Sequence, residues 1–176
     1  MGKAMNYFQL FNLPVSLDLD KAQLSRAYQA LQQLTHPDKF ASGSDQDKRI
    51  ALQKNAQIND AYTTLKHPLS RAQHMLALRG MEINGEQQTM QDTAFLMQQM
   101  ELREALEDAR DNEDALLKFS DELSLEIKQK IGQLEALFDA PETSKQNEEI
   151  AHEIRKLTFI YKFQSQVEHH LELLEE

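Results

Sequence analysis

The apolar residues of this chain recur at spacings of three and four along most of its length, which is the period of a helix with one buried face. In the first half, two such stripes lie on either side of a short polar segment that contains Pro37. Runs of β-branched residues are few, and glycine and proline are scarce, so this pattern predicts an all-α protein. The two stripes are Leu24, Tyr28 and Leu31, then Ile58, Ala61, Tyr62 and Leu65.

Start and stop signals set the helix limits in this half. Asp20 with Gln23 three residues later has the pattern of a capping box, which predicts a helix start. That helix ends before Pro37, because proline disfavours helix at the preceding residue and has no amide hydrogen to donate. Gly80 is suited to follow the last helix of this half. The predicted helices are 7–11, 20–36, 45–66 and 69–79.

The second half contains three longer helical patterns. We expect the first at 89–110, with Thr89 and Asp92 able to cap it, the second at 114–138, and the third from about residue 144. Short loops between long amphipathic helices predict an antiparallel three-helix bundle. The predicted domains are therefore 1–80, including a connector helix, and 86–176. The apolar stripes are Leu116, Phe119, Leu123, Ile127, Ile131, Leu134 and Phe138, then Ile150, Ile154, Leu157, Tyr161, Val167 and Leu171.

Charge divides the chain in the same place. The net charge of −10 argues against a nucleic-acid partner. Residues 1–79 carry +4 and residues 80–176 carry −14. This asymmetry suggests two modules with different partners, although two unequally solvated surfaces would produce it as well.

Several classes of function have no support in the sequence. The chain has no cysteine, so disulfides, thiolate metal sites and cysteine nucleophiles are excluded. There is no glycine-rich phosphate loop and no recognisable nucleophile arrangement, so we expect neither an enzyme nor a cofactor. No apolar run reaches ~20 residues and MGKAMNYF lacks a signal-peptide core, so we expect no membrane partner and a cytoplasmic location.

The histidines outside residue 36 do not form an evident metal site. His169 and His170 lack a carboxylate and histidine pattern of suitable spacing, so we interpret them as a solvated polar pair. His67, His74 and His152 are isolated, and we interpret them as surface or capping residues.

The polar segment between the first two stripes carries His36, Pro37 and Asp38. Pro37 stiffens the turn, so docking costs less conformational entropy. Asp38 offers a carboxylate to an arginine of a partner, a charge-assisted contact stronger than a neutral one. His36 is able to pack and donate beside it. The alternative is that Pro37 only ends a helix and its two neighbours only cap one.

This arrangement of helices around the tripeptide resembles the J-domain family. In that family the His-Pro-Asp loop contacts a DnaK-type chaperone and triggers ATP hydrolysis there, which implies a co-chaperone. Lys39 and the helix positions Lys21 and Arg26 would then face an acidic partner surface and mainly speed encounter. The matching residues are Tyr7, Phe8, Leu13, Pro14, Ala27, Tyr28, Leu31, His36, Pro37, Asp38, Lys39, Ile58, Ala61, Tyr62 and Leu65.

Three longer strings resemble one branch of that family, the HscB iron–sulfur cluster co-chaperones. They are HPDKFASGS at 36–44, HPLSRA at 67–72 and QDTAFLMQQMELRE at 91–104, and the similarity extends to the RKLTFIYKF segment. The resemblance implies an HscA-type ATPase chaperone as one partner. It implies an IscU-type iron–sulfur scaffold as the other, delivered for cluster transfer.

The predicted helix at 89–110 has two apolar faces at 100° per residue. One face is a core stripe of Phe95, Gln99, Leu102, Leu106 and Ala109, and a second lies mostly away from it. Phe159 lies about 180° from its own helix's stripe, so we expect it to be solvated. By resemblance, the client site is this second face with its acidic neighbours: Leu96, Met97, Met100, Glu101, Glu104, Asp108 and Phe159.

The second face and Phe159 could instead pack internally, against the predicted domain 1–80 or its connector helix at 69–79. Two other functions also stay open. The chain could be a J-domain co-chaperone for a different client, or a helical adaptor without chaperone activity.

Overall fold

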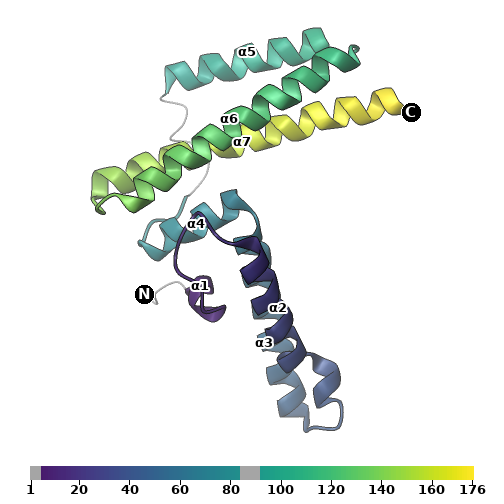
Figure 1. Cartoon of the computed structure of the whole chain (residues 1–176), viewed down its shortest axis with the longest axis vertical. Helices are drawn as coiled ribbons and strands as arrows, with labels where there is room; N and C mark the ends of the chain where they lie inside the picture. The colour runs from purple at the N-terminus through teal and green to yellow at the C-terminus, as the bar shows by residue number, and fades with distance from the viewer. Residues whose placement is uncertain (1–4, 84–91) are drawn as a thin grey trace. The chain divides into compact units, whose positions relative to one another are not determined.

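The computed structural model describes residues 5–83 and 92–176, and all regular elements among them are helical (Figure 1). The chain forms two compact units, 1–81 and 82–176. The predicted helix cap at Thr89 lies outside the described residues.

Unit 1 is built around an antiparallel hairpin of two helices, α2 and α3. A short 3₁₀ helix, η1, lies at the tip of the hairpin, while α1 and α4 lie toward its other end (Figure 1). The first half of the chain therefore places its His-Pro-Asp segment at an exposed end of the unit. The elements are α1 (Tyr7–Leu10), α2 (Lys21–Thr35), η1 (Pro37–Phe40), α3 (Asp45–Lys66) and α4 (Pro68–Leu78).

The cap predicted at Asp20 and the glycine predicted to follow the last helix, Gly80, are confirmed, and the structure adds a cap at Ser44. The Asp20 carboxylate accepts hydrogen bonds from the amides of Ala22, at 2.9 Å, and Gln23, at 3.3 Å. Ser44 caps α3 by accepting from the Asp47 amide. Gly80 has a φ of +89°, in the left-handed region that glycine adopts without strain.

The hairpin changes character along its length. Near α1 and α4 the interior is apolar, with Phe8, Leu24, Ile58, Ala61, Leu65 and Leu76 buried. Tyr28 of α2 and Tyr62 of α3 are half-buried and stack at 4.0 Å. The Tyr28 hydroxyl donates to Asn59 Oδ1 at 2.6 Å, and Asn55 donates to Gln32 Oε1 at 3.0 Å. Polar bonds thus join the helices near η1.

The HPLSRA string has a structural role at the end of α3. The buried Arg71 guanidinium donates to the carbonyls of Leu65, at 2.8 Å, and Leu17, at 2.6 Å. Ser70 donates to the Thr64 carbonyl at 2.6 Å. The last carbonyls of a helix lack partners within it, so these bonds stabilise the junction of α3 and α4. Sequence reasoning had not assigned Arg71 this role.

Unit 2 consists of three helices, α5 (Thr93–Ala109), α6 (Glu113–Asp139) and α7 (Ser144–Glu175). Helices α6 and α7 form a long antiparallel pair, and α5 lies along α6 (Figure 1). Asn112 and Thr143 cap α6 and α7. Helix α5 begins at Thr93, because Asp92 is extended and its side chain accepts from the Phe95 amide.

Five of the seven residues of the predicted α6 stripe are buried, Leu116, Leu123, Ile127, Leu134 and Phe138, whereas Phe119 and Ile131 are half-buried. The α7 stripe needed correction. Tyr161 and Leu171 are only half-buried, whereas Ile160 and Phe163 are fully buried. Residues 157, 160, 163 and 167 share one face of a helix, and Tyr161 lies about 100° away from Ile160.

Candidate interaction sites

The His-Pro-Asp segment forms a pre-shaped turn at the tip of unit 1. Pro37 occupies the first position of η1, where the missing amide hydrogen costs nothing. His36 caps η1, since its Nδ1 accepts the Asp38 amide at 3.2 Å, and its carbonyl accepts from the Lys39 amide at 3.0 Å. Two backbone-directed bonds therefore fix the turn.

The Asp38 side chain is more exposed than that of His36. It is 92% exposed and that of His36 is 52% exposed. The carboxylate lies 3.5 Å from His36 Nδ1, but in the neutral ring this nitrogen already accepts the Asp38 amide and has no proton to share. His36 therefore acts as a helix cap, as the alternative interpretation of the tripeptide expected, whereas the Asp38 carboxylate faces solvent.

The predicted basic residues are spread along unit 1. Lys39 directly follows Asp38, but Lys21 is the first residue of α2, so a helix of about 21 Å separates it from the turn. Arg26 is exposed between them. Lys21 lies instead near His67, whose pKa is lowered by burial, then by Arg71 and then by Lys21.

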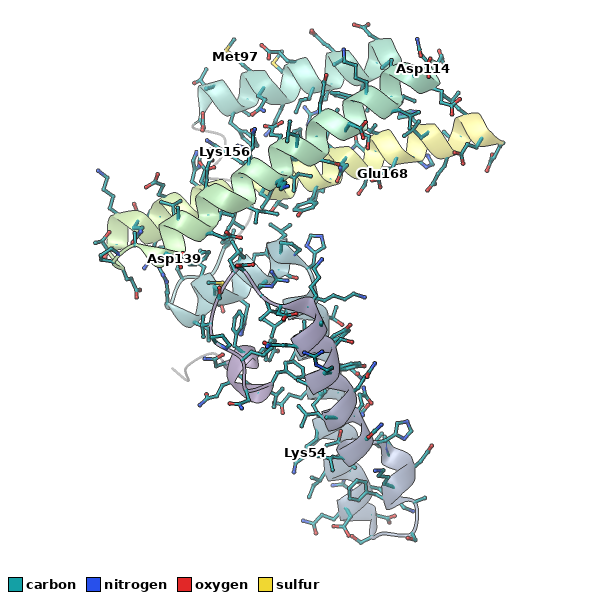
Figure 2. All side chains as sticks on the ribbon, viewed as in Figure 1. Lys54, Met97, Asp114, Asp139, Lys156 and Glu168 are labelled. Atoms are coloured by element: carbon teal, nitrogen blue, oxygen red, sulfur yellow. The ribbon has the colours of Figure 1, made fainter. Side chains whose placement is uncertain are left out.

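The second predicted site lies on α5. Leu96 is 36% exposed, Met97 57% and Met100 60%, so the prediction that these side chains face away from the core is confirmed. Figure 2 shows Met97 on the side of α5 that faces away from α6. Carboxylates on the same helix are exposed as well. We call the α5 residues of this site the α5 surface: Leu96, Met97, Met100, Glu101, Glu104 and Asp108.

Phe159 does not belong to an exposed face, and the expectation that it is solvated was wrong. It is half-buried, meets the edge of Phe95 at 5.6 Å and stacks on Phe163 at 5.9 Å. The Arg103 guanidinium lies 5.7 Å from its ring centre. The helical wheel of α7 alone missed this, because α5 packs over that part of α7.

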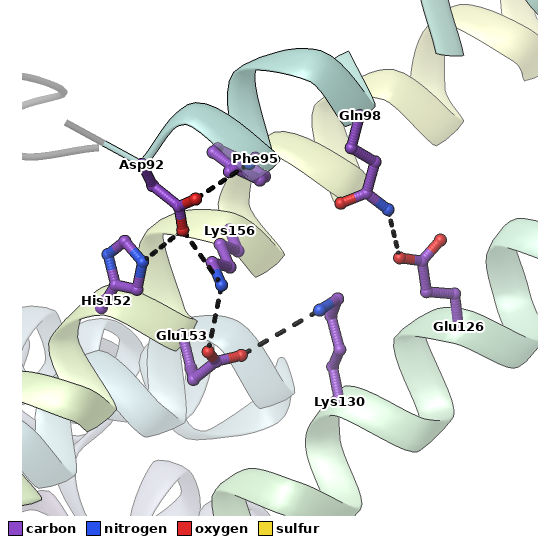
Figure 3. A network of polar contacts seen from close by, with 8 residues as sticks. All are labelled: Asp92, Phe95, Gln98, Glu126, Lys130, His152, Glu153 and Lys156. Carbon is purple, nitrogen blue, oxygen red and sulfur yellow. Dashed lines mark hydrogen bonds and ion pairs between the residues drawn. The ribbon is translucent and has the colours of Figure 1, made fainter. Parts of the chain in front are cut away.

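A polar network joins the start of α5 to α7 (Figure 3). Asp92 Oδ1 accepts the Phe95 amide at 2.9 Å, while its Oδ2 lies 2.8 Å from His152 Nε2 and 3.3 Å from Lys156 Nζ. These contacts, the backbone bond first and His152 next, lower the pKa of Asp92 to about 2. The sequence had suggested that His152 is an isolated surface or capping residue, and this interpretation was wrong, because His152 bonds to Asp92.

The network continues from Lys156 toward α6. Glu153 lies 3.4 Å from Lys156 and 4.0 Å from Lys130 of α6. Farther along α5, Gln98 donates to the Glu126 carboxylate of α6 at 2.8 Å. The amino-terminal turns of α5 are thus tied to both neighbouring helices.

Two kinds of site have no counterpart in the described parts of the chain, 5–83 and 92–176. No cluster of three or more histidine, aspartate or glutamate residues there could hold a metal ion. No helix there is long and apolar enough to cross a membrane.

Known proteins are similar to this chain in both sequence and fold. Residues 91–168 match the family described as the HSCB C-terminal oligomerisation domain. The chain is 53% identical over 167 residues to the co-chaperone protein HscB homolog of Pseudoalteromonas atlantica, covering 93% of this chain and 95% of that protein. The corresponding protein of Shewanella loihica is 46% identical over 174 residues, with 93% and 96% covered.

Solved structures agree. The chaperone HscB from Vibrio cholerae superposes with a TM-score of 0.85 at 42% identity, covering 97% of this chain and 99% of that one. The human co-chaperone protein HscB has a TM-score of 0.86 at 28% identity, with 96% and 83% covered.

The helical hairpin with its His-Pro-Asp turn, followed by a helical bundle, defines a J-type co-chaperone. The sequence and structural matches extend over nearly the whole chain. The chain belongs to the HscB family of iron–sulfur cluster co-chaperones.

Proposed function

We propose that this protein raises the ATPase activity of an HscA-type chaperone through His36, Pro37 and Asp38, and delivers to it an IscU-type scaffold held on the α5 surface. The observation that carries the proposal is the Asp38 carboxylate, 92% exposed on a turn already fixed by backbone bonds. A preformed turn loses little entropy on docking, and an exposed carboxylate is suited to an arginine of the chaperone.

The α5 surface supports the second half of the proposal. Methionine side chains adapt to irregular partner surfaces, and Met97 and Met100 are the most exposed of the large apolar residues of α5. The neighbouring carboxylates of Glu101, Glu104 and Asp108 would favour a basic client. Phe159 would contribute beneath α5, through its contact with Phe95.

Charge and linkage support a two-partner role. The basic residues of unit 1, including Lys39, Arg26 and Lys21, would speed encounter with an acidic chaperone surface. Because both sites belong to one chain, a bound client is kept at high effective concentration near the chaperone. We place this activity in the cytoplasm, without nucleic acid, membrane or cofactor.

The experiment measures ATP hydrolysis by a purified HscA-type chaperone with this protein, with an IscU-type scaffold, and with both. The proposal predicts stimulation by this protein alone and a larger effect when the scaffold is added at a concentration too low to act by itself. No stimulation, with a chaperone that still responds to a peptide substrate, would refute the first half. Equal stimulation with and without scaffold would refute delivery.

A further inference from the structure

The Asp92 network connects two segments that resemble the HscB family. The proposed interaction sites include only some of the residues in these segments. Asp92 belongs to QDTAFLMQQMELRE and Lys156 to RKLTFIYKF, and their side chains lie 3.3 Å apart across unit 2 (Figure 3). Beside this ion pair, Phe95 of the first segment meets Phe159 of the second. The two segments thus form one junction between α5 and α7.

Helix α5 has few other anchors. Only Phe95 and Leu106 of its 17 residues are buried, whereas nine residues of α7 are. An isolated helix of this length is only marginally stable in water, so its order depends on contacts with its neighbours. The polar ties to α7 and α6 lie at Asp92 and Gln98. They flank Leu96 and Met97.

We infer that Asp92 and Lys156 are positioning residues for the α5 surface: they hold the first turns of α5 on α7, so that Leu96, Met97 and Met100 are ordered before a partner binds. The inference rests on the proposed client site on α5. Without the tie, part of the population has a displaced or frayed first turn. Binding must then order it, which weakens the apparent affinity in proportion to the competent fraction.

The chain offers a substitution that isolates the tie from the helix cap. Asparagine and aspartate are about equally good N-caps, so Asp92→Asn keeps an oxygen for the Phe95 amide while removing the negative charge. Lys156→Met removes the opposite charge and keeps an unbranched side chain that is one atom shorter. Glu107→Gln is the matched control, because it also removes one negative charge and one ion pair. That pair joins Glu107 to Arg110, the C-cap of α5, at 3.1 Å, so it does not connect α5 to another helix.

The affinity of a purified IscU-type scaffold is measured by calorimetry for each variant. We expect Asp92→Asn and Lys156→Met to raise Kd about three- to fivefold, the upper range for a partly exposed ion pair, and Glu107→Gln to leave it within twofold. The double variant should raise Kd by less than the product of the two single effects, because the Asp92–Lys156 ion pair is lost in both single variants. Lys156→Arg should retain affinity near that of the unchanged protein.

Two further readouts separate positioning from general destabilisation. Amide hydrogen exchange of Phe95–Gln98 should quicken in Asp92→Asn, while stimulation of the chaperone ATPase without client stays unchanged. If both charge-removing variants bind the scaffold as tightly as Glu107→Gln, the inference is overturned. If the unchanged protein does not bind the scaffold at all, the proposed function fails instead, and the exchange rates alone then decide whether the tie orders α5.

Discussion

Replacing both Met97 and Met100 with serine tests whether the α5 surface binds a client. The two side chains are 57% and 60% exposed, so their removal leaves the core of unit 2 intact. Substitutions at such positions usually change the free energy of unfolding by less than about 0.5 kcal/mol each. The fold should therefore survive, with a melting temperature close to that of the unchanged protein.

The binding effect follows from the same exposures. Burying a whole methionine side chain is worth about 1.5–3 kcal/mol, and somewhat more than half of each side chain remains to be covered by a partner. The pair should thus contribute about 2–3 kcal/mol, which corresponds to a Kd raised roughly 30- to 150-fold. Calorimetric titration with an IscU-type scaffold measures this change, and circular dichroism melting of the same samples checks the fold.

The matched control is Leu117→Ser with Leu125→Ser, which removes two similarly exposed apolar side chains from α6. This variant should bind the scaffold normally. Phe159→Ser should lower the melting temperature, because its ring packs between Phe95 and Phe163. The reasoning is refuted if the methionine variant melts normally and binds the scaffold within threefold of the control, since the client would then bind elsewhere.

Two further predictions concern unit 1. Arg71→Met should lower the free energy of unfolding by roughly 3–5 kcal/mol, because the buried carbonyls of Leu65 and Leu17 lose their charged donor. Urea unfolding measures this free energy, and a loss below about 1 kcal/mol would contradict the stabilising role of Arg71. His74 Nε2 accepts a hydrogen bond from the Tyr7 amide, and burial lowers the pKa of His74 below its unfolded value of 6.5. The neutral ring therefore stabilises the fold fully above pH 6.5, and this contribution to the free energy of unfolding declines as the pH falls below that value. The melting temperature of His74→Gln should therefore fall less than that of the unchanged protein between pH 7.5 and 5.5, and parallel curves would contradict the assignment.

Local signals predicted much of the fold. Asp20 caps its helix as expected, because a cap depends on residues only two or three positions away. The position of the His-Pro-Asp turn follows likewise from Pro37. The exposure of Met97 and Met100 could be predicted because the core stripe of α5 is separate enough on the helical wheel to leave them outside.

Contacts between distant helices were not predictable in the same way. Asp92 and His152 are 60 positions apart, and neither signals the other in the sequence. Phe159 was expected to be solvated because the wheel of α7 does not include α5, which covers that part of the helix. Ile160 rather than Tyr161 enters the core for a related reason, since the buried face of α7 is set by what packs against it.

The central claim is that the turn at the tip of unit 1 activates a chaperone ATPase, and Asp38→Asn tests it most directly. The substitution keeps the size of the side chain and removes its charge. The backbone amide of residue 38, which donates to His36 Nδ1, is unchanged. Asp18→Asn, which alters another exposed aspartate of unit 1, is the control. Single-turnover ATP hydrolysis by an HscA-type chaperone should lose stimulation by roughly 10- to 150-fold with Asp38→Asn, the worth of one charge-assisted hydrogen bond, and be unchanged with Asp18→Asn. Equal stimulation by a correctly folded Asp38→Asn variant and by the control would contradict the account.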